Sequence, residues 1–113
     1  MLTKKVLKSL SFLEGLSEDE FDTIADSGKE ELYNKDEIIF RDGDQGNTMY
    51  IIEAGAVMIY KDTKNKALGA KELAVLSPGR VFGDMAVLNT GVRSASAKAL
   101  ENNTLLISIE QAL

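Results

Sequence analysis

The stretch that determines both fold and chemistry is residues 82–99, which read FGDMAVLNTGVRSASAKA. Its part from Asp84 to Leu88 is too short and too mixed in character for a strand, and we expect one helical turn there. The triplet Asn89-Thr90-Gly91 has turn composition, and the chain re-enters an extended run at Arg93-Ser94-Ala95-Ser96. A short helix between β-prone runs indicates a β-protein that carries its chemistry on one connection.

This connection has the residue types of an anion site. The first turn of a helix offers unpaired N–H groups and the positive end of the helix dipole. The guanidinium of Arg93 can bind two phosphate oxygens at once, and the carboxylate of Asp84 can accept hydrogen bonds from hydroxyl groups. Small residues let a ligand approach the backbone, and they stand at Gly83, Ala86, Ala95 and Ser96. The pattern predicts a sugar phosphate as the ligand.

On both sides of this connection, short β-prone runs alternate with turn residues. We expect strands at residues 31–34, 37–40, 48–54, 56–62, 73–76, 94–100 and 104–108. Many short strands at regular spacing favour a jelly-roll (double-stranded β-helix) barrel over a parallel sheet. The predicted fold is therefore mainly β with flanking α-helices, and it carries a short helix in the phosphate-binding connection.

Two helices are expected before the strands. Apolar residues at helical spacing mark the first over residues 2–10. The second begins at Ser17, where Ser17 to Glu20 form a capping box, and it stops at Gly28, a C-terminal glycine. The 113 residues fit one domain, with helices in 1–28, the barrel in 29–108 and the start of a truncated or absent C-terminal helix in 109–113.

Composition excludes several function classes. The net charge is −5, which opposes binding to the phosphate backbone of nucleic acids. The sequence has no histidine and no cysteine, so Ser-His-Asp and Cys-His catalysis and the common zinc sites are absent. No apolar run reaches the roughly 18 residues needed to span a bilayer, and the N-terminus is not a signal peptide. We expect a cytoplasmic, non-enzymatic protein without a metal or a membrane partner.

Three segments resemble one known family, and they follow one another along the chain in the order found in that family. They are residues 12–18, which precede the second helix, residues 38–57, a segment with turn glycines (the glycine-punctuated segment), and residues 82–96, which contain Phe82-Gly83-Asp84 and Arg93-Ser94-Ala95-Ser96. The chain resembles the cyclic nucleotide-binding domain of bacterial catabolite activators, kinase regulatory subunits and cyclic-nucleotide-gated channels. Two positions depart from the family pattern. Asp84 stands where the family usually has Glu, and Val92 stands where it often has Pro.

The resemblance implies a ligand and a set of contacts. Arg93 should pair with the cyclic phosphate and Asp84 with the ribose 2′-hydroxyl, while backbone N–H groups and the Ser94 hydroxyl contact the remaining oxygens. The implied ligand is cAMP or cGMP, with cAMP favoured, and no metal. The implied site residues are Phe82, Gly83, Asp84, Met85, Ala86, Arg93, Ser94, Ala95 and Ser96.

These observations favour a bacterial regulatory sensor that transmits ligand occupancy to an effector protein or attached domain, with a homodimer left open. Two alternatives are a jelly-roll interaction module without a ligand and the sensor fragment of a transcription regulator.

Single residues also have alternative interpretations. Arg93 alone would be interpreted as a solvated strand arginine paired with a nearby carboxylate, and Asp84 as a helix N-cap. Segment 42–53 imitates a calcium-binding loop, but Gly46 and Asn47 break that pattern. We interpret Gly43, Gly46 and Gly55 as turn glycines with positive φ.

Overall fold

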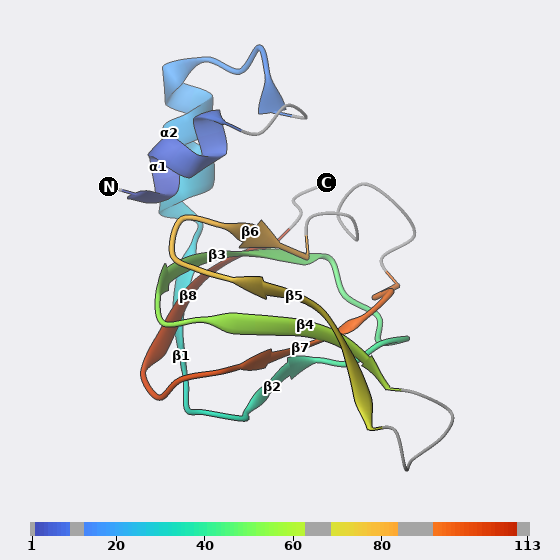
Figure 1. Ribbon diagram of the computed structural model, residues 1–113. Coiled ribbons are helices and arrows are strands. Elements are labelled where there is room, and N and C mark those ends of the chain that lie inside the picture. Colours follow the sequence, from blue (N-terminus) through green and yellow to red (C-terminus); the bar gives the residue numbers. More distant parts are fainter. Residues whose placement is uncertain (1, 10–12, 63–68, 84–91, 111–113) are drawn as a thin grey trace.

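The computed structural model describes residues 2–9, 13–62, 69–83 and 92–110 (Figure 1). Within these ranges the chain forms two helices and eight strands. The helices are α1 (Leu2–Lys8) and α2 (Glu18–Asp26). The strands are β1 (Lys29–Tyr33), β2 (Ile38–Phe40), β3 (Thr48–Ala54), β4 (Val57–Asp62), β5 (Ala70–Leu76), β6 (Val81–Phe82), β7 (Ser96–Ala99) and β8 (Thr104–Glu110).

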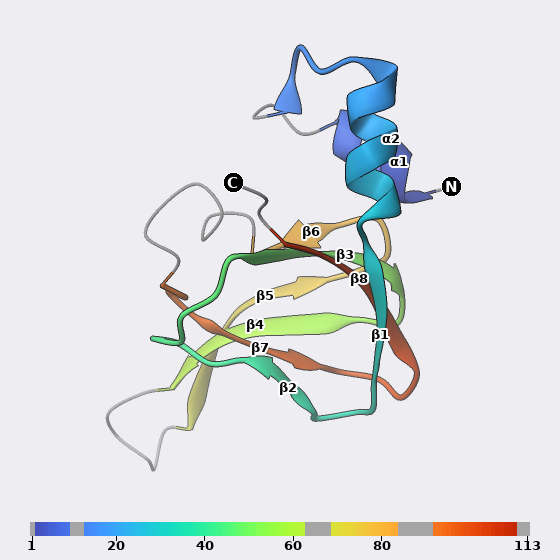
Figure 2. The same ribbon diagram turned by 180° about the vertical axis from the view of Figure 1, so that it is seen from behind.

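The strands form two four-stranded antiparallel sheets, with the orders β1-β8-β3-β6 and β2-β7-β4-β5. Neighbours in each sheet are mostly distant in sequence, because the chain crosses repeatedly between the two layers. Figure 1 and the reverse view in Figure 2 show the helices together at one end of this β-sandwich. The arrangement confirms the predicted jelly roll with N-terminal helices.

Strand β3 is buried on both faces. Since successive side chains of a strand point in opposite directions, its residues enter two different hydrophobic clusters. Met49 and Ile51 face a cluster that includes Phe21 of α2. Tyr50 and Ile52 instead face the core between the two sheets. The helices therefore cover the outer face of one sheet, and the inner faces of both sheets meet in a separate core that lies next to the predicted anion-binding connection.

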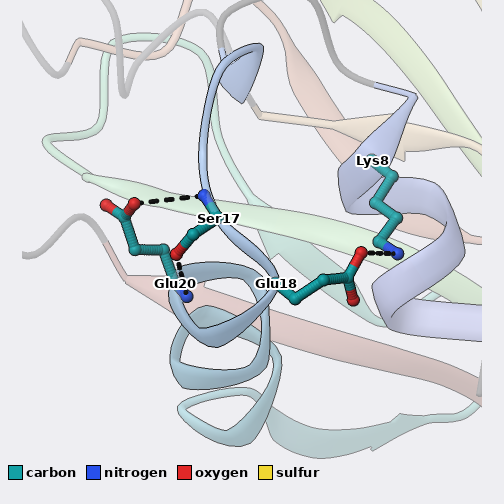
Figure 3. Close-up of polar contacts among 4 residues, drawn as sticks. All are labelled: Lys8, Ser17, Glu18 and Glu20. Atoms are coloured by element: carbon teal, nitrogen blue, oxygen red, sulfur yellow. Dashed lines mark hydrogen bonds and ion pairs between the residues drawn. The ribbon is translucent and has the colours of Figure 1, made fainter.

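The predicted capping box of α2 is present. Glu20 donates its backbone N–H to the Ser17 hydroxyl at 3.2 Å, and Ser17 donates its backbone N–H to the Glu20 carboxylate at 3.1 Å (Figure 3). Figure 3 also shows the ion pair between Lys8 of α1 and Glu18, which joins the two helices. The sequence signal that located this helix is thus the contact that begins it.

The helix ends next to Gly28, as expected, but not through a left-handed glycine. The C-cap is Ser27, and Gly28 has no positive φ. A Cβ atom on Gly28 would lie 2.7 Å from Cγ2 of Ile107. Glycine is required here because the chain passes close to β8 as it leaves the helix.

Several expected bounds differ from the observed ones, and three differences have a clear physical cause. The short strand β6 was not predicted, and it forms because Val81 and Phe82 pair with the edge of β3. Strand β5 begins earlier than expected, at Ala70. The expected C-terminal helix does not begin at residue 109, because Ile109 and Glu110 continue β8 and pair with Met49 and Thr48. Residues 111–113 lie outside the described ranges.

Candidate functional site

Arg93 lies where the predicted anion-binding connection returns to the barrel, and its backbone is paired with the turn between β2 and β3. Gly43 donates its N–H to the Arg93 carbonyl at 2.8 Å, and Arg93 donates its N–H to the Asp44 carbonyl at 2.9 Å. A β-bridge between Gln45 and Val92 extends this pairing. The glycine-punctuated turn and the returning chain, separated by about fifty residues in sequence, are therefore joined by backbone hydrogen bonds at Arg93.

The Arg93 side chain is only 5% exposed and points into the protein. Its Nη1 donates to the carbonyl oxygen of Gly83 at 3.1 Å, and its Nη2 donates to the carbonyl oxygen of Thr48 at 2.7 Å. The guanidinium carbon lies over the Phe40 ring, 4.2 Å from its centroid, and 6.0 Å from the centroid of Tyr50. This placement contradicts the alternative of a solvated strand arginine.

Two glycines make room for this guanidinium. A Cβ atom on Gly83 would lie 2.8 Å from Nη1 of Arg93, and one on Gly46 would lie 2.8 Å from its Nε. Gly83 also has a φ of +77°, which glycine adopts without strain. Gly43 and Gly55 have the expected positive φ, but Gly46 does not, so that expectation was wrong. At position 46, glycine instead leaves room for Arg93, whose guanidinium would have to move if a side chain were present.

Electrostatics make Arg93 a favourable place for an anion. Burial lowers its pKa from the ordinary arginine value, and the neighbouring Tyr50 and Asp44 oppose that shift. The Asp44 carboxylate itself accepts a hydrogen bond from the backbone N–H of Arg41 at 2.9 Å. Within the described residues, no carboxylate forms an ion pair with Arg93. A charge removed from water in this way gains from a bound anion.

The other predicted site residues differ in their exposure to solvent: Phe82 and Ser96 are buried, whereas Ser94 is exposed. Phe82 is 4% exposed and stacks on Tyr50 with centroids 5.1 Å apart, so its ring belongs to the core. Ser96 is 1% exposed, and its hydroxyl accepts the backbone N–H of Asp42 at 2.9 Å. Ser94 is exposed, and Ala95 is partly exposed. Asp84, Met85 and Ala86, with the helical turn expected there, lie outside the described residues.

Sequence reasoning missed the residues that hold the guanidinium. These are Phe40, Gly46 and the carbonyl of Thr48, all on or beside the β2–β3 turn. Their only local signal was that this turn belongs to the glycine-punctuated segment 38–57. In the described part of the chain, no cluster of acidic residues could hold a metal ion. None of the described helices is long and apolar enough to cross a membrane.

Comparisons with known proteins point in the same direction. The sequence profile of the cyclic nucleotide-binding domain matches residues 30–112. The chain is 36% identical over 102 residues to the cyclic AMP receptor protein of Thermus thermophilus, covering 88% of this chain and 45% of that protein. It is 32% identical over 108 residues to human cGMP-dependent protein kinase 2, covering 96% of this chain and 14% of that protein.

A solved structure has the same fold. The structure of cAMP-bound PfPKA-R matches with a TM-score of 0.86 at 29% identity, over 97% of this chain and 38% of that one. The chain thus spans less than half the length of each of these three relatives.

Proposed function

The chain belongs to the cyclic nucleotide-binding domain family, and from this we propose that it is a regulatory module in which Arg93 binds the phosphate of a cyclic nucleotide. The observation that carries the proposal is the buried Arg93 guanidinium, held by the carbonyls of Gly83 and Thr48. A side chain that is already fixed loses little conformational freedom when a ligand arrives, so more of the interaction energy appears as affinity.

The local charge explains how an acidic chain binds an anion. The net charge of −5 repels a polyanion, but one phosphate interacts mainly with the charge next to it. Hydrogen bonds between a guanidinium and a phosphate are charge-assisted and are roughly twice as strong as neutral ones. The role of Arg93 is therefore to supply the dominant attraction at short range.

The remaining contacts are proposed from the family pattern. Asp84 accepts a hydrogen bond from the ribose 2′-hydroxyl, and the backbone N–H groups of Gly83, Ala86 and Ala95 bind phosphate or ribose oxygens. Ser94 is exposed and directly follows Arg93. Its hydroxyl contacts a phosphate or ribose oxygen of the same ligand in this proposal. Supporting this assignment, Arg93 contacts the carbonyl of Gly83, the residue that enters this segment.

We propose cAMP rather than cGMP as the ligand, and a binding rather than a catalytic role. Of the three relatives described above, two are named for cAMP, the Thermus receptor protein and PfPKA-R, and the third is a cGMP-dependent kinase. The absence of histidine and cysteine from the sequence supports a non-catalytic role. We propose further that occupancy of the site is passed to an attached domain or partner; in support, the backbone of Arg93 is hydrogen-bonded to the β2–β3 turn, so the site is connected to the barrel.

Calorimetric titration with cAMP and with cGMP tests the proposal. The titration gives the Kd of each nucleotide. In urea denaturation, a nucleotide present at 100 times its Kd should raise the free energy of unfolding by about 2.7 kcal/mol. Arg93→Ala should abolish that increase, while Arg80→Ala, which removes an exposed arginine, should leave it unchanged. Absence of binding by the wild type, or an unchanged Kd in Arg93→Ala, would overturn the proposal.

A further inference from the structure

We propose that Phe40 is a positioning residue for the anion site, whose ring face holds the Arg93 guanidinium in its binding orientation. The proposal rests on the proposed function of Arg93 and adds a residue outside the segment from Phe82 to Ser96. The ring acts through Arg93, so its removal should weaken nucleotide binding even though the ring need not touch the ligand.

The first support is an irregularity in strand β2 that aims the ring inward. Ile38 pairs with Lys98 and Phe40 pairs with Ala97, so β2 advances two residues while β7 advances one. Successive strand residues normally point to opposite faces, but Ile39 and Phe40 both pack against the inner core. An extra residue of this kind re-aims a side chain. Here it directs Phe40 to the guanidinium.

The second support is the geometry of the contact. The guanidinium carbon of Arg93 lies 4.2 Å from the Phe40 centroid, well within the ~6 Å range of a cation–π interaction. The five N–H donors of a guanidinium lie in its plane, and two of them bind the carbonyls of Gly83 and Thr48. The Phe40 ring has no hydrogen-bond acceptor oxygen, and the contact with it is made through the central carbon of the guanidinium. Phe40 can therefore fix the orientation of the guanidinium without competing with an anion.

The third support is electrostatic. Arg93 is 5% exposed and forms no ion pair with a carboxylate of the described residues. The face of an aromatic ring carries negative potential, which compensates a nearby buried cation. Tyr50 is the more distant ring, at 6.0 Å. A leucine at position 40 would fill much of the volume but would supply no such potential, and the guanidinium would lose its support.

The matched variants are Phe40→Leu, which removes the ring, Phe40→Tyr, which keeps it, and Ile39→Val, which shortens an aliphatic side chain at the same bulge. In calorimetric titrations with cAMP, Phe40→Leu should raise the Kd at least tenfold. Phe40→Tyr and Ile39→Val should keep it within about threefold. If Phe40 acted only by packing, Ile39→Val and Phe40→Leu would raise the Kd for cAMP by similar factors, and that result would overturn the proposal.

A second measurement reports on the guanidinium itself, with or without nucleotide. The sequence has three arginines, at 41, 80 and 93, so their Nε–H signals are few in a ¹H–¹⁵N spectrum. Loss of one signal in Arg93→Lys assigns it. Stacking on Phe40 should shift that signal upfield in the wild type and in Phe40→Tyr, and the shift should vanish in Phe40→Leu. An unchanged signal and Kd in Phe40→Leu would refute the role of Phe40, whereas no cAMP binding by the wild type would refute the proposed function.

Discussion

Gly83 and Arg93 constrain each other in two ways. The carbonyl oxygen of Gly83 accepts a hydrogen bond from Nη1 of Arg93 at 3.1 Å. A Cβ atom on Gly83 would lie 2.8 Å from the same nitrogen and 3.0 Å from the carbonyl oxygen of Thr48. With a φ of +77°, the backbone at position 83 also disfavours any side chain. Backbone conformation and close approach therefore both require glycine at the entry to the proposed site.

Gly83→Ala should weaken both folding and binding. The strained backbone should cost about 1–3 kcal/mol of unfolding free energy, because a methyl group is unfavourable at this φ. The same methyl group should displace the guanidinium and raise the Kd for cAMP at least tenfold. Urea denaturation measures the first effect, and calorimetric titration measures the second.

Gly79→Ala is the matched control for that substitution. Gly79 has a φ of +90°, but a Cβ atom there would have no neighbour within 4 Å. This variant should share the loss of stability and keep the cAMP affinity of the wild type. If both alanine variants bind cAMP equally well, Gly83 has no role in positioning Arg93.

Gly46→Ala separates binding from stability in the opposite way. Position 46 lacks a positive φ, so alanine adds no left-handed strain there. Its methyl group would instead meet Nε, Nη2 and Cζ of Arg93 at 2.8, 2.9 and 3.1 Å. Because the end of an arginine side chain can move, we expect a stability change below about 1 kcal/mol and a Kd for cAMP at least tenfold higher. A large loss of stability with unchanged affinity would show that the guanidinium does not occupy this position.

The fold followed from the sequence wherever a local signal was strong. The capping box at Ser17 begins α2, and the continuous apolar run from Met49 to Ile52 gives a strand with both faces buried. The two-residue strand β6 is too short to show any period, and it exists only because Tyr50 and Ile51 offer it a partner edge. The polar start of β5 was missed for a related reason, since Lys71 is held in the strand by pairing with Lys61 rather than by burial.

The candidate site was predictable only in part. Arg93 stood out because of its neighbours in sequence, and its burial agrees with an inward role. Phe40 and Thr48 did not stand out, because they reach Arg93 through strand pairing across some fifty residues of chain. A register shift of one residue in β2 decides whether Phe40 faces the core. Such a shift leaves no mark in the local sequence.

Loss of the helix cap should destabilise the chain without affecting the proposed site. Ser17→Ala removes the hydroxyl that accepts the Glu20 N–H, and this change should cost about 1 kcal/mol of unfolding free energy. Ser17→Asp restores an acceptor and should recover most of that loss. Thermal unfolding measures both variants. The Kd for cAMP should not change, since α2 packs on the outer face of the sheet, and a weaker Kd would indicate that the helices contribute to the site.

Tyr33 should make folding stability depend on alkaline pH. Burial raises its pKa, and Glu31 adds to the shift by accepting the hydroxyl hydrogen bond at 2.6 Å and through its charge. Below about pH 10, the ordinary tyrosine pKa, the hydroxyl is protonated in both the folded and unfolded chain, and its contribution to stability is complete. As the pH rises further, the unfolded chain loses this proton first, so the free energy of unfolding falls.

Tyr33→Phe removes that titration, and its free energy of unfolding should fall less steeply than that of the wild type above pH 10. Urea denaturation of both proteins from pH 8 to pH 11 measures the difference. Some decline should remain in the variant, because burial and Glu31 also raise the pKa of Tyr50. Glu31→Gln keeps a hydrogen-bond acceptor but removes the charge, so its slope should lie between those of the wild type and Tyr33→Phe. Parallel curves for all three proteins would mean that the Tyr33 hydroxyl is equally easy to ionise in the folded and unfolded chain.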